Sequence, residues 1–233
     1  MSETPDTVYH RRPKGLFRDY FETITTCVIF VIFSRAFVFQ QSKIPTGSMI
    51  PTLLIGDYIM VNKFVYSPVP TILGRKILPF KGINRGDIIV FKYPEEPEKD
   101  YIKRIIGLPG ETVEIRNCTV YIDGEPIKEP YKQHDNAYLC RFEEAGYYPP
   151  TRVPENNYFA LGDNRDHSRD SRYWGFVPRD YIKGRALLIW WSYEEEPGAY
   201  LQTGLVARIK SIATKATHFI TRSRWNRSFK VIR

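Results

Sequence analysis

Apolar residues are distributed in two different ways along this chain. Near the N-terminus they form one long stretch from Tyr20 to Phe39, which is uncharged from Thr23 to Ser34 and is interrupted by Arg35. Beyond it they form short runs rich in Val, Ile, Tyr and Phe, separated by turn-forming pairs such as Asp-Gly and Pro-Gly. The runs cover residues 58–65, 87–93, 101–106, 112–115, 119–122, 158–161 and 185–191. Short strands with no long helical period between them predict a mainly β protein, with a partly open, antiparallel, barrel-like body.

The N-terminal stretch predicts one transmembrane helix over residues 20–40. Its uncharged part is shorter than the ~20 residues that a bilayer requires, but an arginine near one end of a span can extend its charge to the headgroups. A buried core helix and a cleavable signal peptide are the alternatives. The residues that follow are too large for a signal-peptide cleavage site, so we favour an uncleaved single-pass anchor.

Basic residues are concentrated at the two ends of the chain. Four of them precede the apolar stretch, namely Arg11, Arg12, Lys14 and Arg18. Because basic flanks stay in the cytoplasm, we expect residues 1–19 inside the cell and residues 41–203 outside the cytoplasmic membrane. Residues 204–233 hold eight basic residues and no acidic residue. Apolar residues recur among them at roughly helical spacing, which predicts a short basic amphipathic helix on anionic lipid, with a solvated disordered tail as the alternative.

Composition removes several classes of protein. A chain of 233 residues with 42% hydrophobic residues can fill a core, so disorder is excluded as its main state. Three cysteines are too few for a disulfide-framework miniprotein. The net charge of +8 first suggests a nucleic acid partner, but the tail carries that excess and the body is nearly neutral. Membrane lipids are therefore the expected partner of the tail, and we expect no nucleic acid.

The segment just beyond the predicted anchor presents a serine on a restricted turn. Pro45 and Pro51 limit the backbone on either side, and Gly47 permits conformations that other residues resist. Ser48 would be held between them, although an ordinary proline-rich loop would look the same. A serine hydroxyl becomes nucleophilic only beside a base.

The run from Tyr101 to Ile106 supplies a candidate base. Side chains alternate along a strand, so Lys103 shares a face with Tyr101 and Ile105, whereas Arg104 points the other way. Apolar neighbours would desolvate the lysine and lower its pKa from ~10.4 to roughly 7–8, the range of catalytic lysines. An exposed lysine on a surface strand is the alternative.

The densest polar run of the chain extends from Gly162 to Gly175. It combines charges of both signs with hydroxyl and amide groups. It lacks the alternating acidic ligands and the central glycine of a calcium loop. A salt-bridged support for a catalytic site fits it better than a merely solvated loop.

Four segments together resemble bacterial type I signal peptidases, the leader peptidase family, in the family's own order. They are residues 45–53, 86–91, 103–110 and 162–177. The resemblance implies a membrane-bound serine endopeptidase that removes N-terminal signal peptides from exported proteins after small residues. It also implies a Ser-Lys dyad, an acyl-enzyme intermediate and no metal or organic cofactor. Signal peptides would then be the substrates.

The resemblance also assigns roles to individual residues. Ser48 would be the nucleophile and Lys103 the general base, with the Ser48 backbone N–H and the Thr46 hydroxyl forming an oxyanion hole. Ser168 would orient the amine of Lys103. The remaining charged residues would form two structural pairs, Arg104 with Asp163 and Arg172 with Asp170.

Two features depart from the family. His167 stands where relatives often have asparagine, which raises a Ser-His-Asp alternative with Asp163 or Asp166; we disfavour it because the Lys103 segment is intact. The insertion at residues 116–154 is short, and an oxidising compartment would let its Cys118 and Cys140 form a disulfide, with free thiols as the alternative.

Two other classes compete: a soluble self-cleaving repressor-type protease, and a membrane-tethered protein with a nucleic-acid-binding arm.

Overall fold

The computed structural model describes residues 15–33, 39–63, 82–134, 146–195, 204, 211 and 214–232. The chain divides into two units, residues 1–38 and residues 39–233, and each is considered by itself.

The first unit contains one helix, α1 (Leu16–Phe33). Its first two turns are charged, with an ion pair of 2.8 Å between Arg18 and Glu22, and its apolar residues are exposed. Of the helices that the structure describes, none combines the length and the apolar character that crossing a membrane requires. The anchor predicted over residues 20–40 is therefore not confirmed, and its residues 34–38 lie outside the described ranges.

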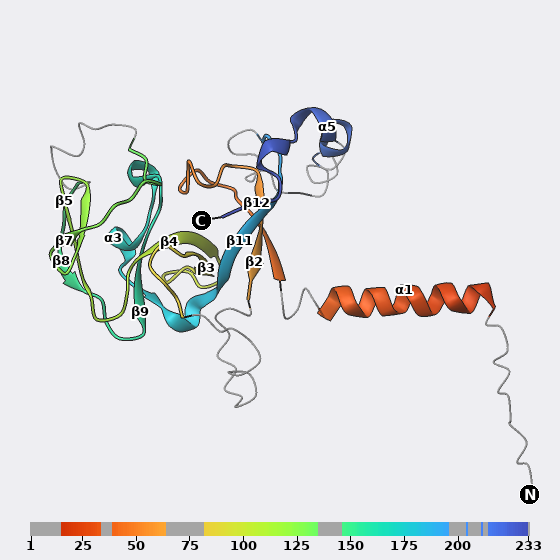
Figure 1. The fold of residues 1–233 in the computed structure, drawn as a ribbon, viewed down its shortest axis with the longest axis horizontal. Coiled ribbons are helices and arrows are strands. Elements are labelled where there is room, and N and C mark those ends of the chain that lie inside the picture. Colours follow the sequence, from red (N-terminus) through yellow and green to blue (C-terminus); the bar gives the residue numbers. More distant parts are fainter. Residues whose placement is uncertain are drawn as a thin grey trace, which may run out of the picture. The chain divides into compact units, whose positions relative to one another are not determined.

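The second unit is mainly β, as predicted, and its larger sheet is antiparallel throughout (Figure 1). The strands follow the order β1 (Phe39–Lys43), β2 (Asp57–Asn62), β11 (Ile182–Ser192), β3 (Ile88–Lys92), β4 (Asp100–Gly107), β9 (Asn157–Leu161) and β10 (Val177–Pro178), and β12 (Lys230–Val231) also pairs with β11. Within the described strands, β1 and β10 are the two edges and do not pair with each other. The sheet is therefore open and the body is not a closed barrel.

A smaller antiparallel sheet lies at one end of this unit (Figure 1). Its order is β7 (Glu125–Pro126), β6 (Thr119–Ile122), β5 (Thr112–Arg116) and β8 (Tyr148–Arg152), so it begins slightly before the insertion predicted at residues 116–154. Cys118 is disulfide-bonded and Cys27 is free, whereas Cys140 lies outside the described residues.

Two apolar clusters cover the two faces of the large sheet, because the side chains of its central strands alternate. On β3, Ile88 and Val90 enter one cluster, and Ile89 and Phe91 enter the other. The first cluster also contains residues from the segment after β1, namely Ile44, Met49 and Leu53. The segment that carries Ser48 is thus fixed to the core on both sides of the serine.

The described end of residues 204–233 is not a separate tail, in contrast to the prediction. It contains α5 (Phe219–Arg222), η7 (Trp225–Arg227) and β12, and Ile232 is buried in the same cluster as Met49. Arg227 donates to the buried carboxylate of Asp57 at 2.7 Å and to the Thr52 carbonyl at 3.0 Å. At least one basic residue of this region therefore pairs with a buried carboxylate and donates to a backbone carbonyl of the protein itself. The net charge of the sequence could not reveal these contacts.

Candidate active site

The segment between β1 and β2 holds Ser48 in a tight turn. The N–H of Ile50 donates to the Gly47 carbonyl at 3.2 Å, and the N–H of Leu53 donates to the Met49 carbonyl at 2.8 Å. A Cβ at position 47 would lie 2.9 Å from the Cδ1 atom of Ile50, so any larger residue there would require the end of the Ile50 side chain to shift. With Met49 and Leu53 buried, Ser48 has little freedom to move.

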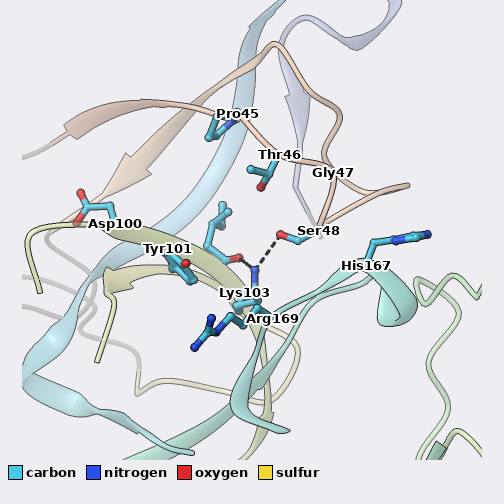
Figure 2. Close-up of a pocket in the computed structure, with 10 residues that line it drawn as sticks. Pro45, Thr46, Gly47, Ser48, Asp100, Tyr101, Lys103, His167 and Arg169 are labelled. Atoms are coloured by element: carbon cyan, nitrogen blue, oxygen red, sulfur yellow. Dashed lines mark hydrogen bonds between the residues drawn. The ribbon is translucent and has the colours of Figure 1, made fainter. Parts of the chain in front are cut away.

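Lys103 reaches this turn from the middle of β4. Its Nζ atom donates to Ser48 Oγ at 2.8 Å and to the Ile102 carbonyl at 3.1 Å. Both side chains are largely buried, since Ser48 is 9% and Lys103 is 3% exposed. Figure 2 shows the hydrogen bond between the two groups, which both line a pocket. The structure thus brings together the two residues that the sequence nominated as nucleophile and base.

Burial lowers the pKa of Lys103 from an ordinary value near 10.5 to about 8. Desolvation is the main cause; the negative charges of Asp170 and Asp163 act against it, and the positive charge of Arg172 adds to it. With a pKa of about 8, roughly one molecule in ten carries a neutral amine at pH 7. A neutral amine in contact with a serine hydroxyl can take up its proton.

The pocket around this pair has a volume of about 310 Å³. One wall is the segment from Pro45 to Ser48, and the opposite wall is the start of β4, from Asp100 to Lys103. Thr46 is exposed, and Figure 2 shows its hydroxyl on the same side of the segment as the Ser48 hydroxyl. A chain passing between the two walls would meet Ser48 Oγ and the Thr46 hydroxyl together.

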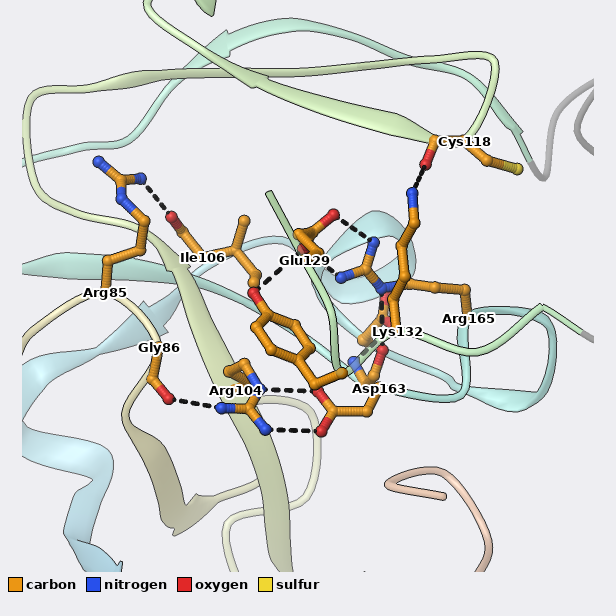
Figure 3. A network of polar contacts seen from close by, with 12 residues as sticks. Arg85, Gly86, Arg104, Ile106, Cys118, Glu129, Lys132, Asp163 and Arg165 are labelled. Carbon is orange, nitrogen blue, oxygen red and sulfur yellow. Dashed lines mark hydrogen bonds and ion pairs between the residues drawn. The ribbon is translucent and has the colours of Figure 1, made fainter. Parts of the chain in front are cut away.

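Arg104, the neighbour of Lys103, points to the other face of β4 and forms a buried ion pair. Its Nε and Nη2 atoms donate to the two carboxylate oxygens of Asp163, both at 2.8 Å (Figure 3). Thr52 Oγ1 donates to the same carboxylate at 2.5 Å, and Arg104 Nη1 donates to the Gly86 carbonyl at 2.8 Å. Asp163 therefore joins β4 to the turn that carries Ser48.

The second predicted pair also forms. Arg172 donates from Nε and Nη2 to the two oxygens of Asp170, at 2.8 and 2.9 Å. Asp170 accepts the Gly162 N–H at 3.1 Å as well, and it precedes the short helix α3 (Ser171–Trp174). This arrangement holds the polar segment against the end of β9.

Ser168 does not make the predicted hydrogen bond with Lys103. Its hydroxyl is buried and bonds to none of the residues that the structure describes. It lies against the main chain of Gly162, where an added Cβ would be 2.2 Å from Ser168 Oγ and 2.5 Å from the Ser48 carbonyl oxygen. The carbonyl of Ile102 instead provides the second acceptor for the Lys103 amine.

The geometry disfavours the Ser-His-Asp alternative. His167 is exposed, and Figure 2 shows its ring directed away from Ser48. Asp163 is bound by Arg104, and Asp166 Oδ1 is 2.9 Å from Nδ1 of a different histidine, His134. Each aspartate therefore has a partner other than His167.

Sequence reasoning missed a further ion pair, the buried one between Arg165 and Glu129. The two side chains bond through both guanidinium Nη atoms, and the Tyr131 hydroxyl donates to the same carboxylate at 3.3 Å (Figure 3). The ring of Tyr131 also lies 3.8 Å from the guanidinium carbon of Arg104. Glu129 stands 36 residues before Arg165, so no local spacing could have paired them.

Comparison with known proteins identifies one family. The family model described as signal peptidase, peptidase S26, matches residues 17–191. Signal peptidase I of Pseudomonas aeruginosa is 36% identical over 208 residues, covering 76% of this chain and 73% of that protein. Signal peptidase I of Buchnera aphidicola subsp. Schizaphis graminum is 33% identical over 264 residues, covering 88% of this chain and 81% of that protein.

The similar solved structures include a signal peptidase I from Enterococcus faecalis that is 40% identical in sequence. The match covers 45% of this chain and 97% of the Enterococcus faecalis chain, with a TM-score of 0.37. The family model spans more than half of the chain, and the curated relatives match across most of its length. The chain therefore belongs to the signal peptidase family of serine peptidases, peptidase S26.

Proposed function

We propose that this chain is a membrane-bound endopeptidase that removes N-terminal signal peptides from exported proteins after small residues, using Ser48 and Lys103 as a catalytic dyad. The observation that carries the proposal is the 2.8 Å hydrogen bond between Ser48 Oγ and a buried lysine whose pKa is lowered to about 8. The names of the relatives, signal peptidase I, supply the substrate class.

In the acylation step, the neutral Lys103 amine accepts the Ser48 proton while Ser48 Oγ attacks the scissile carbonyl carbon. The negative charge that develops on the carbonyl oxygen is stabilised by the Ser48 N–H and the Thr46 hydroxyl. When the tetrahedral intermediate collapses, the Lys103 ammonium gives its proton to the leaving amine, and the signal peptide remains on Ser48 as an ester.

In the deacylation step, Lys103 accepts a proton from a water molecule that attacks the ester carbonyl carbon. Collapse of the second tetrahedral intermediate breaks the bond to Ser48 Oγ, which takes the proton back from Lys103. The enzyme returns to its starting state and the signal peptide leaves with a new carboxylate.

The substrate would bind as an added β-strand. Among the described strands, β4 pairs with β3 over residues 100–104 but pairs with β9 only from Arg104 onward. The main chain of residues 100–103 therefore offers one open side, and these residues form a wall of the pocket. A pocket of about 310 Å³ shared by several residues of a bound peptide suits small side chains next to the scissile bond.

Membrane attachment is supported by the apolar residues of α1, which are exposed from Ile24 to Phe33. With the basic N-terminus inside, the second unit would lie on the extracytoplasmic side. Exposed aromatic residues near the C-terminus, Phe219, Trp225 and Phe229, would add a contact with lipid headgroups. We expect the chain to stay with membranes during alkaline carbonate extraction; its release into the supernatant would contradict the anchor.

The decisive experiment is cleavage of a preprotein by the full chain in detergent. We expect cleavage after an alanine at the end of the signal peptide, lost in Ser48→Ala and retained in His167→Ala. A wild-type chain that leaves the preprotein intact would overturn the proposal. A Ser48→Ala variant that still cleaves, or an inactive His167→Ala variant, would overturn the dyad.

A further inference from the structure

Asn164 lies directly beside the turn that carries Ser48. Its backbone N–H donates to the Ser48 carbonyl at 3.1 Å, and its side-chain Nδ2 donates to the Gly47 carbonyl at 3.2 Å. The residue is 5% exposed. One residue from the polar segment thus binds two successive carbonyls around the catalytic serine.

The carbonyl of Gly47 and the N–H of Ser48 belong to the same peptide group. A trans peptide is planar, and its C=O and N–H point in opposite directions, so fixing one fixes the other. Among the described residues, none accepts a hydrogen bond from the Ser48 N–H. The Gly47 carbonyl accepts this bond from Asn164 and a second bond from the Ile50 N–H at 3.2 Å, and the two bonds together set the direction of a donor that the described residues do not use.

We propose that Asn164 is a positioning residue that aims the Ser48 N–H at the carbonyl oxygen of the substrate. This inference rests on the proposed function, in which that N–H stabilises the oxyanion. The hydrogen bond to the Gly47 carbonyl also polarises the peptide group, which makes its N–H a stronger donor. Asn164 acts through the peptide and does not itself touch the reacting atoms.

The surrounding structure holds the main chain of Asn164 independently of its side chain. The Gln133 N–H donates to the Asp163 carbonyl at 2.8 Å, and the Arg165 N–H donates to the Gln133 carbonyl at 3.0 Å. Gly162 allows the segment to pass close to the Ser48 carbonyl. Loss of the Asn164 amide should leave this frame, and the backbone bond from residue 164 to Ser48, in place.

The test compares Asn164→Ala with a matched control, Asn157→Ala. Asn157 also donates from Nδ2 to a backbone carbonyl, that of Glu155 at 3.0 Å, but far along β9 from the pocket walls. Removing an oxyanion donor outright costs about 10²- to 10³-fold in kcat, so a misdirected donor should cost about 10- to 100-fold. We expect that loss in Asn164→Ala with KM within about twofold and the pH midpoint unchanged, and wild-type kinetics in Asn157→Ala.

A second measurement separates this role from loss of structure. A peptide boronate that adds to Ser48 should bind Asn164→Ala more weakly by the same factor as kcat/KM. Binding of an uncleaved preprotein should be the same in Ser48→Ala with and without Asn164→Ala. A kcat of Asn164→Ala within about twofold of wild type would overturn the positioning role. Equal weakening of boronate binding and preprotein binding by Asn164→Ala would overturn it as well. Neither result would contradict the activity of the wild type. Absence of cleavage by the wild type would instead overturn the proposed function.

Discussion

The two faces of β4 surround a buried basic side chain with different partners. Lys103 and Arg104 are consecutive and almost equally buried, at 3% and 2% exposure. Arg104 meets a carboxylate with two hydrogen bonds of 2.8 Å, whereas Lys103 bonds to a hydroxyl and a carbonyl. A buried charge needs a partner of opposite sign, and a group that lacks direct contact with one gives up its charge more readily.

This difference separates the chemical role from the structural role within two residues. Arginine remains protonated in proteins and forms a planar fork, so it suits the pair with Asp163. Lysine changes its protonation state when it is buried, so it suits proton transfer with Ser48. The strand alternation that sends the two side chains apart keeps the Asp163 carboxylate out of contact with the lysine.

The largest expected effect is on the cleavage rate, when Lys103 is replaced by arginine, the residue found on the opposite face of β4. In Lys103→Arg the proposed base is permanently charged, so acylation of Ser48, the proposed nucleophile, should slow by about 10³-fold or more. Cleavage rates under single-turnover conditions measure this loss, and circular dichroism checks that the variant is folded. Activity within tenfold of wild type would show that Lys103 is not the base.

Breaking the pair on the other face should affect stability first. Arg104→Met leaves the Asp163 carboxylate buried with Thr52 as its remaining side-chain donor, which should lower the free energy of unfolding by about 3–5 kcal/mol. Urea unfolding measures the change. The double variant Arg104→Met/Asp163→Leu should recover much of the loss, because an apolar pair of similar size needs no charge compensation. A single variant as stable as wild type would contradict the contrast between the faces.

The pH dependence should reveal the neutral lysine in two ways. Activity should fall about tenfold per pH unit below the Lys103 pKa of about 8, because protonation removes the proposed base. Since the folded pKa lies below the unfolded one near 10.5, the unfolded chain binds more protons between the two values. The free energy of unfolding should therefore rise with pH over that window, by up to about 3 kcal/mol relative to Lys103→Met. A flat activity profile from pH 6 to 9 would contradict a lysine base.

The smallest expected effect lies where the two faces meet, at Thr52. Thr52→Val removes the hydroxyl that donates to Asp163 but leaves the Arg104 pair intact, so stability should fall by about 1–2 kcal/mol. Thr151→Val, which removes an exposed hydroxyl bonded to the Pro149 carbonyl, is the matched control and should change stability by less than about 0.5 kcal/mol. Equal unfolding midpoints for the two variants would show that the Thr52 bond contributes nothing.

Local patterns predicted the central strands well. The run at residues 119–122 matches β6, and the run at residues 101–106 lies within β4 (Asp100–Gly107). β8 (Tyr148–Arg152) was missed because it contains Pro149 and Pro150, which are poor strand formers but are accepted at the edge of a sheet. β1 (Phe39–Lys43) was missed because its first residues continue the apolar stretch of the predicted anchor.

The candidate site was predictable where its residues stand in short motifs. Ser48, Lys103 and the two ion pairs came from segments that resemble the family, and the structure brings them together. The Glu129 partner of Arg165 depends on how two segments lie side by side, as does the bond between Asn164 and Gly47. Such contacts join residues far apart in the sequence, and only the folded arrangement of the strands defines them.

The ion pair between Arg227 and Asp57 forms only after almost the whole chain has been synthesised. These residues are 170 positions apart, and the same arginine holds the Thr52 carbonyl beside the Ser48 turn. A ribosome that has finished the serine turn must translate the rest of the body before this support exists, although domains generally fold from the N-terminus as they emerge. Nascent chains arrested before Arg227 should therefore lack this support for Ser48, the proposed nucleophile, so proteolytic competence would begin late in translation.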